Sequence, residues 1–506
     1  MRDRLTDSLS GGQKQACVLA AMLALDTAIL VLDEPTAALD PAGKQLVGQI
    51  VERLKQLGKT LVISDPNLDW FQHLVDHALV LSPQGELQFE GSLPNFLQNT
   101  DLLYESGIPI PGLTAVVNAL RSRGQSVAGW RSLSEAQNCL AAHLPESQRV
   151  SQQLPQQTSP QTSPQTPQQI PQQTSQQISP QTPQQISQQI SQPISQRVSA
   201  QTSPITSQTV SPASSSTTQD DERQSAAVVE FREVTYTYPG AAVAAIADLN
   251  LIASAGQILG IIGQNGSGKS TAIRHLNGLL RPQQGTVRVA GQAVARATVA
   301  EMARWVGMAF QNPDLMLFNE TVEQEVFFAL RQQSSKQQSS EQQSPEQQAQ
   351  RRTELETLLE KFGLADQRTR SPLALSVGEK QILAILCALT LDPAVLVLDE
   401  PTFGMDRWGR DRLGQTLRQL QAQGKTILCV SHDLPLLAEY ADEIAVFQSG
   451  KLVDRRPTRE LFQDTQLFQQ LHIPLPASVQ LANQFLHQAC LTPEEFADRF
   501  LNFPAP

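Results

Sequence analysis

Segments near the two ends of this 506-residue chain repeat each other at a nearly constant spacing. Leu9 to Gln15 (LSGGQKQ) returns as Leu375 to Gln381 (LSVGEKQ), 366 positions later, and the ILVLDEPT of residues 29–36 returns as VLVLDEPT at the same spacing. The spacing is again 366 for GKT at 58–60 and 424–426, and it is 365 for IPxP at 108–111 and 473–476. A spacing held over about 100 residues predicts a tandem duplication of one domain, because solenoid repeats are only roughly 20–50 residues long.

Between the copies, residues 151–219 consist almost entirely of Gln, Ser, Pro and Thr, with a single charge at Arg197 and no aromatic residue. Such a stretch buries too little apolar area to offset chain entropy, and its many prolines oppose regular structure. We therefore predict a disordered linker over 146–227, with a partner-binding polar tract as the alternative. A shorter low-complexity stretch, 332–350, is predicted to be an inserted surface loop.

The two copies are expected to differ in extent. The second begins near Val228, so the counterpart of its start would fall about 138 residues before Met1. We expect residues 1–145 to form a partial domain without its front half. Residues 228–456 should form a complete domain, followed by a helical tail over 457–506. A truncated gene model and a shortened coding sequence both fit this pattern.

Composition limits the class of protein. The net charge of −11 argues against a sequence-independent binder of DNA or RNA, so no nucleic-acid partner is expected. The five cysteines are scattered without metal-ligand spacing, which favours reduced thiols in the cytosol. The most apolar stretch, Ala16 to Leu32, is interrupted by Asp26; we predict a buried helix followed by a buried strand, not a membrane span.

A P-loop pattern, GxxxxGK[ST], is met at every fixed position by residues 263–270. The apolar run 258–262 before it predicts a buried strand, and 271–280 predicts a helix. Backbone N–H groups of such a loop bind phosphate oxygens at a helix N-terminus. Lys269 is expected to reach the β- and γ-phosphates, and Ser270 to ligate Mg²⁺. A chance glycine turn is the alternative. The predicted ATP-binding residues of this segment are Gly263, Gln264, Asn265, Gly266, Ser267, Gly268, Lys269, Ser270 and Thr271.

Two further motifs carry chemistry. The strand 395–398 ends in Asp399 and Glu400, where one carboxylate can hold Mg²⁺ and the next can orient the attacking water. A solvated pair of acidic residues at a strand end is the alternative. In the first copy, a helix starts with exposed N–H groups that favour an anion, unless they form a simple helix cap. Its predicted ATP-binding residues are Ser10, Gly11, Gly12 and Gln13.

Together these residues resemble the nucleotide-binding domains of ABC transporters, in which the P-loop, the LSGGQ signature and the LDEP strand occur in this order. The resemblance implies an α/β P-loop NTPase cassette with a helical subdomain, one copy complete and one partial, that binds ATP and Mg²⁺. It also implies that Tyr238 stacks on adenine, that Gln311 of the Q-loop contacts Mg²⁺ or water, and that His432 is the switch histidine at the γ-phosphate. An ordinary strand aromatic and a strand-end histidine are the alternatives for Tyr238 and His432.

The sequence around the Q-loop, FQNPDLMLF at 310–318, is similar to the energy-coupling-factor (ECF) and cobalt-type branch of the family. That resemblance implies an ATPase that drives import of a vitamin or metal ion from the cytoplasmic face of the plasma membrane. Its partners would be a transmembrane coupling subunit and a substrate-binding membrane subunit. The second nucleotide-binding half would lie in cis, or in another cassette in trans.

In this family each ATP lies between one cassette's P-loop and the other's signature, so departures can be sorted by site. The site built on the second-copy P-loop and the first-copy signature has every element, with Glu400 and His432 as its catalytic residues. The other site would use a second-copy signature in which Val377 replaces Gly and Glu379 replaces Gln, and a switch position occupied by Pro66. We therefore expect one hydrolytic site. A soluble twin-cassette ATPase acting on ribosomes or DNA, and an inactive remnant, are the alternative functions.

Overall fold

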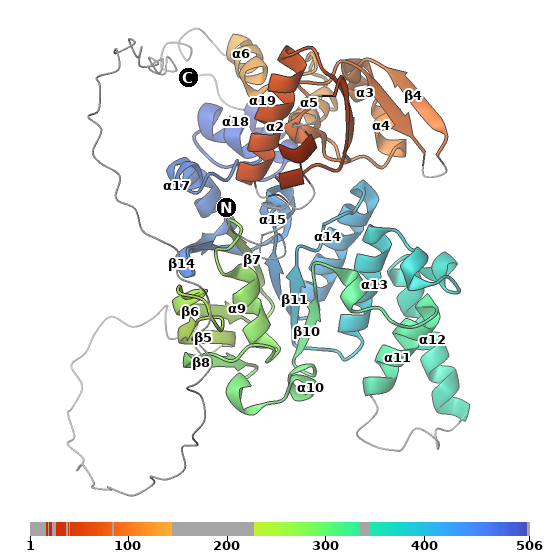
Figure 1. Ribbon diagram of the computed structural model, residues 1–506, viewed down its shortest axis with the longest axis vertical. Coiled ribbons are helices and arrows are strands. Elements are labelled where there is room, and N and C mark those ends of the chain that lie inside the picture. Colours follow the sequence, from red (N-terminus) through yellow and green to blue (C-terminus); the bar gives the residue numbers. More distant parts are fainter. Residues whose placement is uncertain are drawn as a thin grey trace, which may run out of the picture. The chain divides into compact units, whose positions relative to one another are not determined.

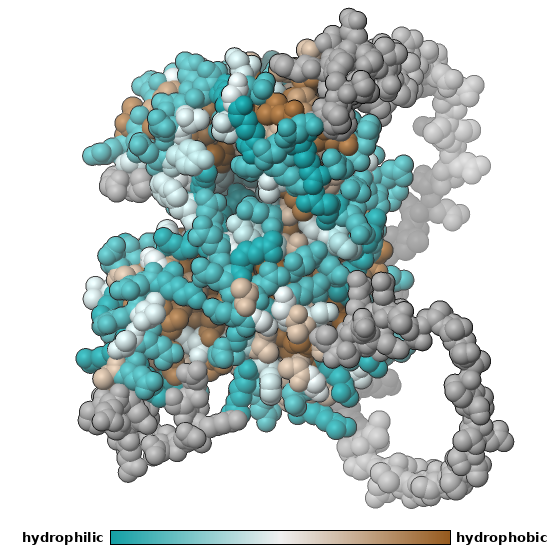
Figure 2. All heavy atoms as spheres, turned by 180° about the vertical axis from the view of Figure 1, so that it is seen from behind, coloured by the Kyte–Doolittle hydropathy of each residue, from teal (hydrophilic) through white to brown (hydrophobic). Residues whose placement is uncertain are grey.

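The computed structural model describes residues 17–18, 20–22, 27–36, 39, 41–82, 85–143, 227–333 and 345–502 (Figure 1). The predicted linker lies outside these ranges apart from Ala227, and so does the first-copy signature. Within them no helix is both long and apolar enough to cross a membrane. One face of the molecule is covered mainly by hydrophilic side chains (Figure 2).

The second copy is built around a six-stranded sheet whose first five strands run parallel and whose last is antiparallel. Its spatial order is β10 (Val306–Ala309), β11 (Val395–Asp399), β12 (Thr426–Val430), β7 (Ile258–Gly263), β13 (Glu443–Gln448) and β14 (Lys451–Pro457). The strands β7, β10, β11 and β12 are buried at every position. Continuous apolar runs of this kind suit parallel strands that are covered on both faces.

Two layers cover that sheet. On one face lie helix α9 (Lys269–Leu276) and a four-stranded antiparallel sheet. Its strands, in spatial order, are β6 (Ile246–Ser254), β5 (Ala227–Tyr236), β8 (Gln284–Val289) and β9 (Gln292–Ala293), with the short α10 (Val299–Met302) beyond them. On the other face lie α11 (Val322–Gln333), α12 (Pro345–Lys361), α13 (Val377–Leu389), α14 (Arg407–Ala422) and α15 (Leu434–Tyr440). This is the P-loop NTPase architecture with a helical subdomain that the sequence predicted.

The first copy repeats the back half of this fold almost residue for residue. Strand β1 (Ile29–Asp33), helix α2 (Pro41–Gln56) and strand β2 (Thr60–Ser64) have the bounds of β11, α14 and β12 shifted by 366 positions. The parallel pairing of β1 with β2 also has the register of β11 with β12. The antiparallel pair β3 (Ala78–Leu81) and β4 (Leu87–Gly91) reproduces the irregularity found in the pair β13 and β14. The duplication is thus confirmed within the described residues.

The first copy's strand is buried on one face only: Leu30 and Leu32 are each 5% exposed, as predicted for the strand at the end of the stretch 16–32, whereas the prediction is wrong for the opposite face. Ile29 and Val31 of β1 are each 62% exposed, whereas Val395 and Val397 at the equivalent positions of β11 are 0% exposed. In the second copy, α9 and the antiparallel sheet cover this face. The described residues of the first copy contain no corresponding layer.

Both copies continue into helical tails. In the first copy these are α3 (Leu93–Gln98), α4 (Thr100–Glu105), α5 (Gly112–Arg121) and α6 (Leu133–His143). In the second they are α16 (Thr458–Gln463), α17 (Thr465–Gln470), α18 (Ala477–Phe485) and α19 (Pro493–Leu501). Helix α5 shares one apolar core with α18 and α19, and Gln137 Nε2 donates a hydrogen bond of 2.7 Å to Gln484 Oε1. The tails therefore pack against each other.

The predicted surface insert at 332–350 is shorter than expected where the structure describes it. Helix α11 ends at Gln333 and α12 begins at Pro345, so helix extends into both ends of the stretch. Gln and Glu have good helix propensity, which allows helices to continue into a polar segment.

Candidate functional site

The P-loop residues lie at the carboxyl end of β7 and the start of α9, and the loop needs its glycines. Gly263, Gly266 and Gly268 have φ values of 150°, 79° and 100°. A Cβ atom on Gly263 would lie 2.3 Å from the Phe447 carbonyl oxygen, and one on Gly268 would lie 2.6 Å from that of Ala245. Only glycine fits this conformation and this spacing.

Two polar side chains of the loop, Lys269 and Ser267, are buried within it. Lys269 is buried, and its Nζ donates hydrogen bonds to the carbonyl oxygens of Gly263 (2.7 Å) and Gln264 (3.0 Å). Ser267 is also buried, and its hydroxyl has no hydrogen-bond partner among the described residues. An unpartnered buried hydroxyl in a glycine loop at a helix N-terminus fits the binding of an anion.

Asp399 and Ser270 face each other across the site. Ser270 Oγ lies 3.3 Å from Asp399 Oδ1, and burial is the main cause of the raised pKa of Asp399. No group of three or more His, Cys, Asp or Glu side chains suited to a metal ion occurs in the described ranges. A hydroxyl and one carboxylate are the sparse oxygen ligands that suit Mg²⁺ completed by phosphate oxygens and water.

Glu400 and His432 meet beside the P-loop. Glu400 Oε1 lies 3.4 Å from His432 Nε2, and Glu400 Oε2 accepts a hydrogen bond of 3.0 Å from the His432 backbone N–H. His432 Nε2 also lies 3.3 Å from Asn265 Oδ1 of the P-loop. Burial raises the pKa of Glu400 to about 7. Because β7, β11 and β12 are parallel neighbours, their carboxyl ends bring these three side chains to one edge of the sheet.

The backbone at Glu400 is strained. Its φ is 50°, a left-handed conformation that is uncommon for a residue other than glycine, and its N–H donates to the Val430 carbonyl over 2.8 Å. Such strain is typical of functional sites that are held by surrounding structure.

Tyr238 and Gln311 lie around the same cleft. The Tyr238 hydroxyl is 3.2 Å from Thr271 Oγ1 on the first turn of α9. Gln311, just after β10, is exposed and lines the cleft. Two contacts that sequence reasoning missed connect the segment around Gln311 to α13: Gln381 Nε2 donates to the Phe310 carbonyl at 3.2 Å, and Lys380 pairs with Asp314 at 2.9 Å. No local sequence signal pointed to these contacts.

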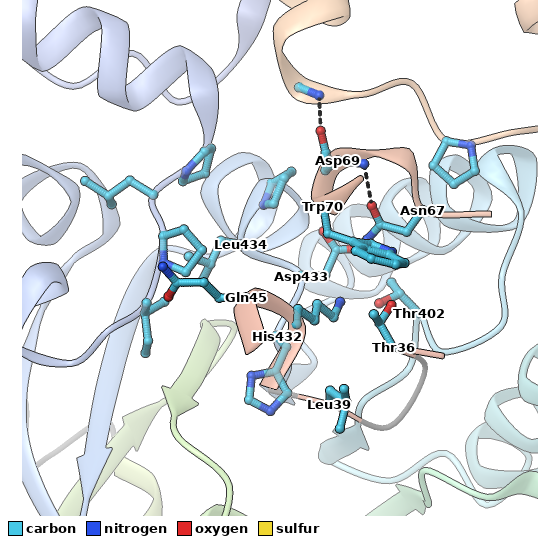
Figure 3. Close-up of a pocket in the computed structure, with 18 of the residues that line it drawn as sticks. Thr36, Leu39, Gln45, Asn67, Asp69, Trp70, Thr402, His432, Asp433 and Leu434 are labelled. Atoms are coloured by element: carbon cyan, nitrogen blue, oxygen red, sulfur yellow. Dashed lines mark hydrogen bonds between the residues drawn. The ribbon is translucent and has the colours of Figure 1, made fainter. Parts of the chain in front are cut away.

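The cleft has a volume of 1440 Å³ and receives side chains from both copies (Figure 3). From the second copy it is lined by the P-loop, Asp399, Glu400 and His432. From the first it is lined by residues of the segment after β1, including Thr36 and Leu39. The predicted signature residues of the first copy, Ser10, Gly11, Gly12 and Gln13, lie outside the described residues.

The first copy keeps the strained turn but has different chemistry around it. Glu34, equivalent to Glu400, has a φ of 40° and a pKa raised mainly by burial. At the switch position stands Pro66. The adjacent Asp65 accepts hydrogen bonds from Thr36 Oγ1 (2.9 Å) and Trp70 Nε1 (3.0 Å). This carboxylate therefore binds its own copy's side chains.

In the second-copy signature, Ser376 and Glu379 form a capping box at the start of α13. Ser376 Oγ accepts from the Glu379 N–H (3.2 Å), and Glu379 Oε2 accepts from the Ser376 N–H (2.8 Å). This capping box is typical of an S-x-x-E sequence, and it engages the Ser376 hydroxyl within the helix cap. Val377 packs closely on Gly404. A Cβ atom added at Gly404 would lie only 2.6 Å from Val377 Cγ1.

The known proteins that this chain is similar to include ATP-binding proteins of ABC transporters. A family model described as ABC transporter matches residues 1–37 and 246–403. A putative ABC transporter ATP-binding protein of Methanosarcina acetivorans is 28% identical over 460 residues, covering 91% of this chain and 66% of that protein. The energy-coupling factor transporter ATP-binding protein EcfA2 of Staphylococcus saprophyticus is 32% identical, covering 54% of this chain and 96% of that protein.

Among solved structures, cbiO1 from Clostridium perfringens, part of the ABC transporter complex cbiONQ, matches with a TM-score of 0.42 and 27% identity. The match covers 51% of this chain and 99% of that chain. The chain spans about two thirds of the length of the Methanosarcina acetivorans relative.

Proposed function

This chain belongs to the family of ABC transporter ATP-binding proteins and has two regions that match it, and we therefore propose that its second copy hydrolyses ATP at the cleft described above. One observation carries the proposal: the P-loop, Asp399, Glu400 and His432 converge at the carboxyl ends of adjacent parallel strands. That convergence supplies phosphate binding, metal binding and water activation within one cleft.

In the proposed mechanism, the P-loop N–H groups and Lys269 bind the β- and γ-phosphates. The Glu400 carboxylate orients a water molecule for attack on the γ-phosphate and accepts its proton, for which a pKa raised towards neutrality is suited. His432, held between Glu400 and Asn265, contacts the γ-phosphate side of the cleft. Tyr238, which bonds to the first turn of α9, lies at the edge where the adenine ring would stack.

Mg²⁺ would be held by Ser270 and Asp399, with Gln311 as a further oxygen ligand. It would neutralise the charge of the β- and γ-phosphate oxygens. The Ser270 hydroxyl and the Asp399 carboxylate lie 3.3 Å apart, close enough to share one cation, which supports this assignment.

The first copy would complete the site with Ser10, Gly11, Gly12 and Gln13 of its signature. The cleft already receives Thr36 and Leu39 from that copy, which supports a composite site. The opposite composite site would be inactive, because Glu379 closes its own helix cap and Pro66 stands at the switch position.

The coupling partner would be a transmembrane subunit of an ECF-type importer of a vitamin or metal ion, with the chain peripheral on the cytoplasmic face of the membrane. The segment after Gln311 exposes Leu315 (77%) and Phe318 (67%), and Phe318 packs edge-on against Phe328 with ring centroids 5.0 Å apart. Contiguous exposed apolar side chains can form an interaction surface, and the pair Phe318 and Phe328 lies beside a segment tied to α13. The similarity to the ECF ATPase of Staphylococcus saprophyticus supports the same partner class.

Steady-state ATPase of three variants tests the proposal. Glu400→Gln should lower kcat by at least about 100-fold, because removal of a placed catalytic group costs this much or more. Ser10→Arg, in the first-copy signature, should have a similar effect. Glu34→Gln is the matched control, since Glu34 shares the strained backbone of Glu400, and it should hydrolyse ATP like the parent. Parental rates in Glu400→Gln would refute the catalytic assignment, and a large loss in Glu34→Gln would refute the asymmetry.

A further inference from the structure

The second P-loop residue is tied to the C-terminal tail. Gln264 Nε2 donates a hydrogen bond of 2.8 Å to the carbonyl oxygen of Leu471, at the end of α17. The two residues are 207 positions apart, so the bond joins the nucleotide site to a different part of the fold. No P-loop pattern requires it, because position 264 is one of the variable positions of GxxxxGK[ST].

The tail end of this bond is held in place. Leu471 is 1% exposed and belongs to the same apolar core as Ile262, the last residue before the P-loop. His472 follows with a φ of 54°, and the Ile473 N–H closes the turn on the Phe468 carbonyl at 3.0 Å. The Leu471 carbonyl oxygen, which accepts the bond from Gln264, is therefore held in a fixed position.

At the P-loop end, the ammonium group of Lys269 is bonded to the loop's own backbone. Lys269 Nζ donates to the carbonyl oxygens of Gly263 and Gln264, and a phosphate in the loop competes for the same ammonium group. The Gln264 carbonyl also accepts a hydrogen bond of 3.1 Å from the Ser267 N–H within the loop, whereas the bond from the Gln264 side chain to Leu471 ties this residue to the tail. We propose that Gln264 is a positioning residue that couples nucleotide occupancy of the P-loop to the tail turn at 471–473. The inference rests on the proposed function, namely that this loop binds ATP.

The same turn leads directly to the contact between the copies. Pro474 and Pro476 restrict the backbone between the turn and α18. Helix α18 packs on α5 of the first copy, and Gln484 of α18 accepts the hydrogen bond from Gln137. A change in the turn is thereby transmitted to the interface of the two tails. Coupling of this kind is reciprocal, so the factor by which nucleotide stabilises the tail turn is also the factor by which restraint of the turn raises nucleotide affinity.

Hydrogen exchange of the full chain, measured with and without the non-hydrolysable analogue AMP-PNP and Mg²⁺, tests the proposal. In the parent chain the nucleotide should slow exchange of the amides in 471–475 by at least about 3-fold, in the range of one neutral hydrogen bond. In Gln264→Leu, which removes the donor but keeps an apolar stem, this nucleotide-dependent protection should disappear. AMP-PNP should bind that variant roughly 2- to 10-fold more weakly.

Two further variants sharpen the result. Gln264→Met also lacks a hydrogen-bond donor but has an unbranched side chain, and it should lose the protection as Gln264→Leu does. It therefore replaces Gln264→Leu in the test if that variant folds poorly. Gln469→Leu is the matched control, because Gln469 is exposed in the same tail and lines the same cleft; it should retain the parental protection. Persistence of the protection in both Gln264 variants, or its absence in a parent that binds AMP-PNP, would overturn the coupling. A parent that does not bind AMP-PNP would instead overturn the proposed function.

Discussion

The repeated strand offers a direct test of which sheet faces are covered. Val397 on β11 and Val31 on β1 occupy equivalent positions, yet Val397 is 0% exposed and Val31 is 62% exposed. Replacing each by Ala removes the same two carbon atoms from the two copies. Any difference in the free energy of unfolding then reports the surroundings and not the substitution.

The expected magnitudes follow from burial. At Val397 the lost transfer free energy is about 1.6 kcal/mol, and the cavity left in a close-packed layer raises the total to about 2–3 kcal/mol. At Val31 less than half of the side chain is removed from water, so the loss should be at most about 0.6 kcal/mol. Urea unfolding followed by tryptophan fluorescence has one probe near each strand, since Trp305 directly precedes β10 and Trp70 packs in the core of the first copy.

The comparison has a clear refuting result. Equal losses of about 2–3 kcal/mol at both positions would mean that Val31 is covered in solution, and the reasoning from its exposed fraction would be wrong. A loss below about 1 kcal/mol at Val397 would contradict the close packing of the covering layer. Native-state hydrogen exchange of β1 and β11 would then identify the strand responsible.

Two other substitutions test backbone strain and charge. Gly268→Ala should destabilise the chain by more than about 2 kcal/mol, because its Cβ would lie 2.6 Å from the Ala245 carbonyl at a φ of 100°; Gly424→Ala, with a φ of 81° and nothing within 4 Å, should cost only about 1 kcal/mol. Equal shifts of Tm in the two variants would contradict this. Arg456 lowers the pKa of Asp464 below its ordinary value of 3.8, so the stability from this pair is complete above about pH 4 and is lost as the pH falls through the lowered pKa. Asp464→Asn should therefore lower Tm at neutral pH, and the difference from the parent should shrink as the pH falls below about 4; a constant difference would contradict the assignment.

The sequence predicted the parts of the fold in which local pattern and tertiary environment agree. The apolar run before the P-loop predicted a strand over 258–262, and β7 spans Ile258–Gly263. The helix predicted over 271–280 is shorter, because α9 ends at Leu276 and Gly278 has a φ of 75°, a conformation that terminates helices. That glycine was a readable signal.

Other features depend on which surfaces meet, so they could not be read from local pattern. The apolar sequence of β1 is that of a buried strand, but its exposure is decided by whether another layer covers it. The bond from Gln264 to Leu471 joins residues far apart in the chain. Glu379 is a third kind of case, because the S-x-x-E pattern of a capping box was present in the sequence but only its departure from the signature was noted.

The strained turn at Glu34 shows that the two copies share a backbone conformation where their side chains differ. Its φ of 40° matches that of Glu400 although Pro66 has replaced the switch histidine beside it. The Glu34 N–H donates to the Ser64 carbonyl over 2.7 Å, the first-copy counterpart of the bond from Glu400 to Val430, so loss of the turn would remove the bond that extends the pairing of β1 with β2. Main-chain geometry tied to strand pairing is inherited after the surrounding side chains have drifted. A left-handed acidic residue at the end of a parallel strand is therefore kept in a copy that carries proline where the other copy carries histidine.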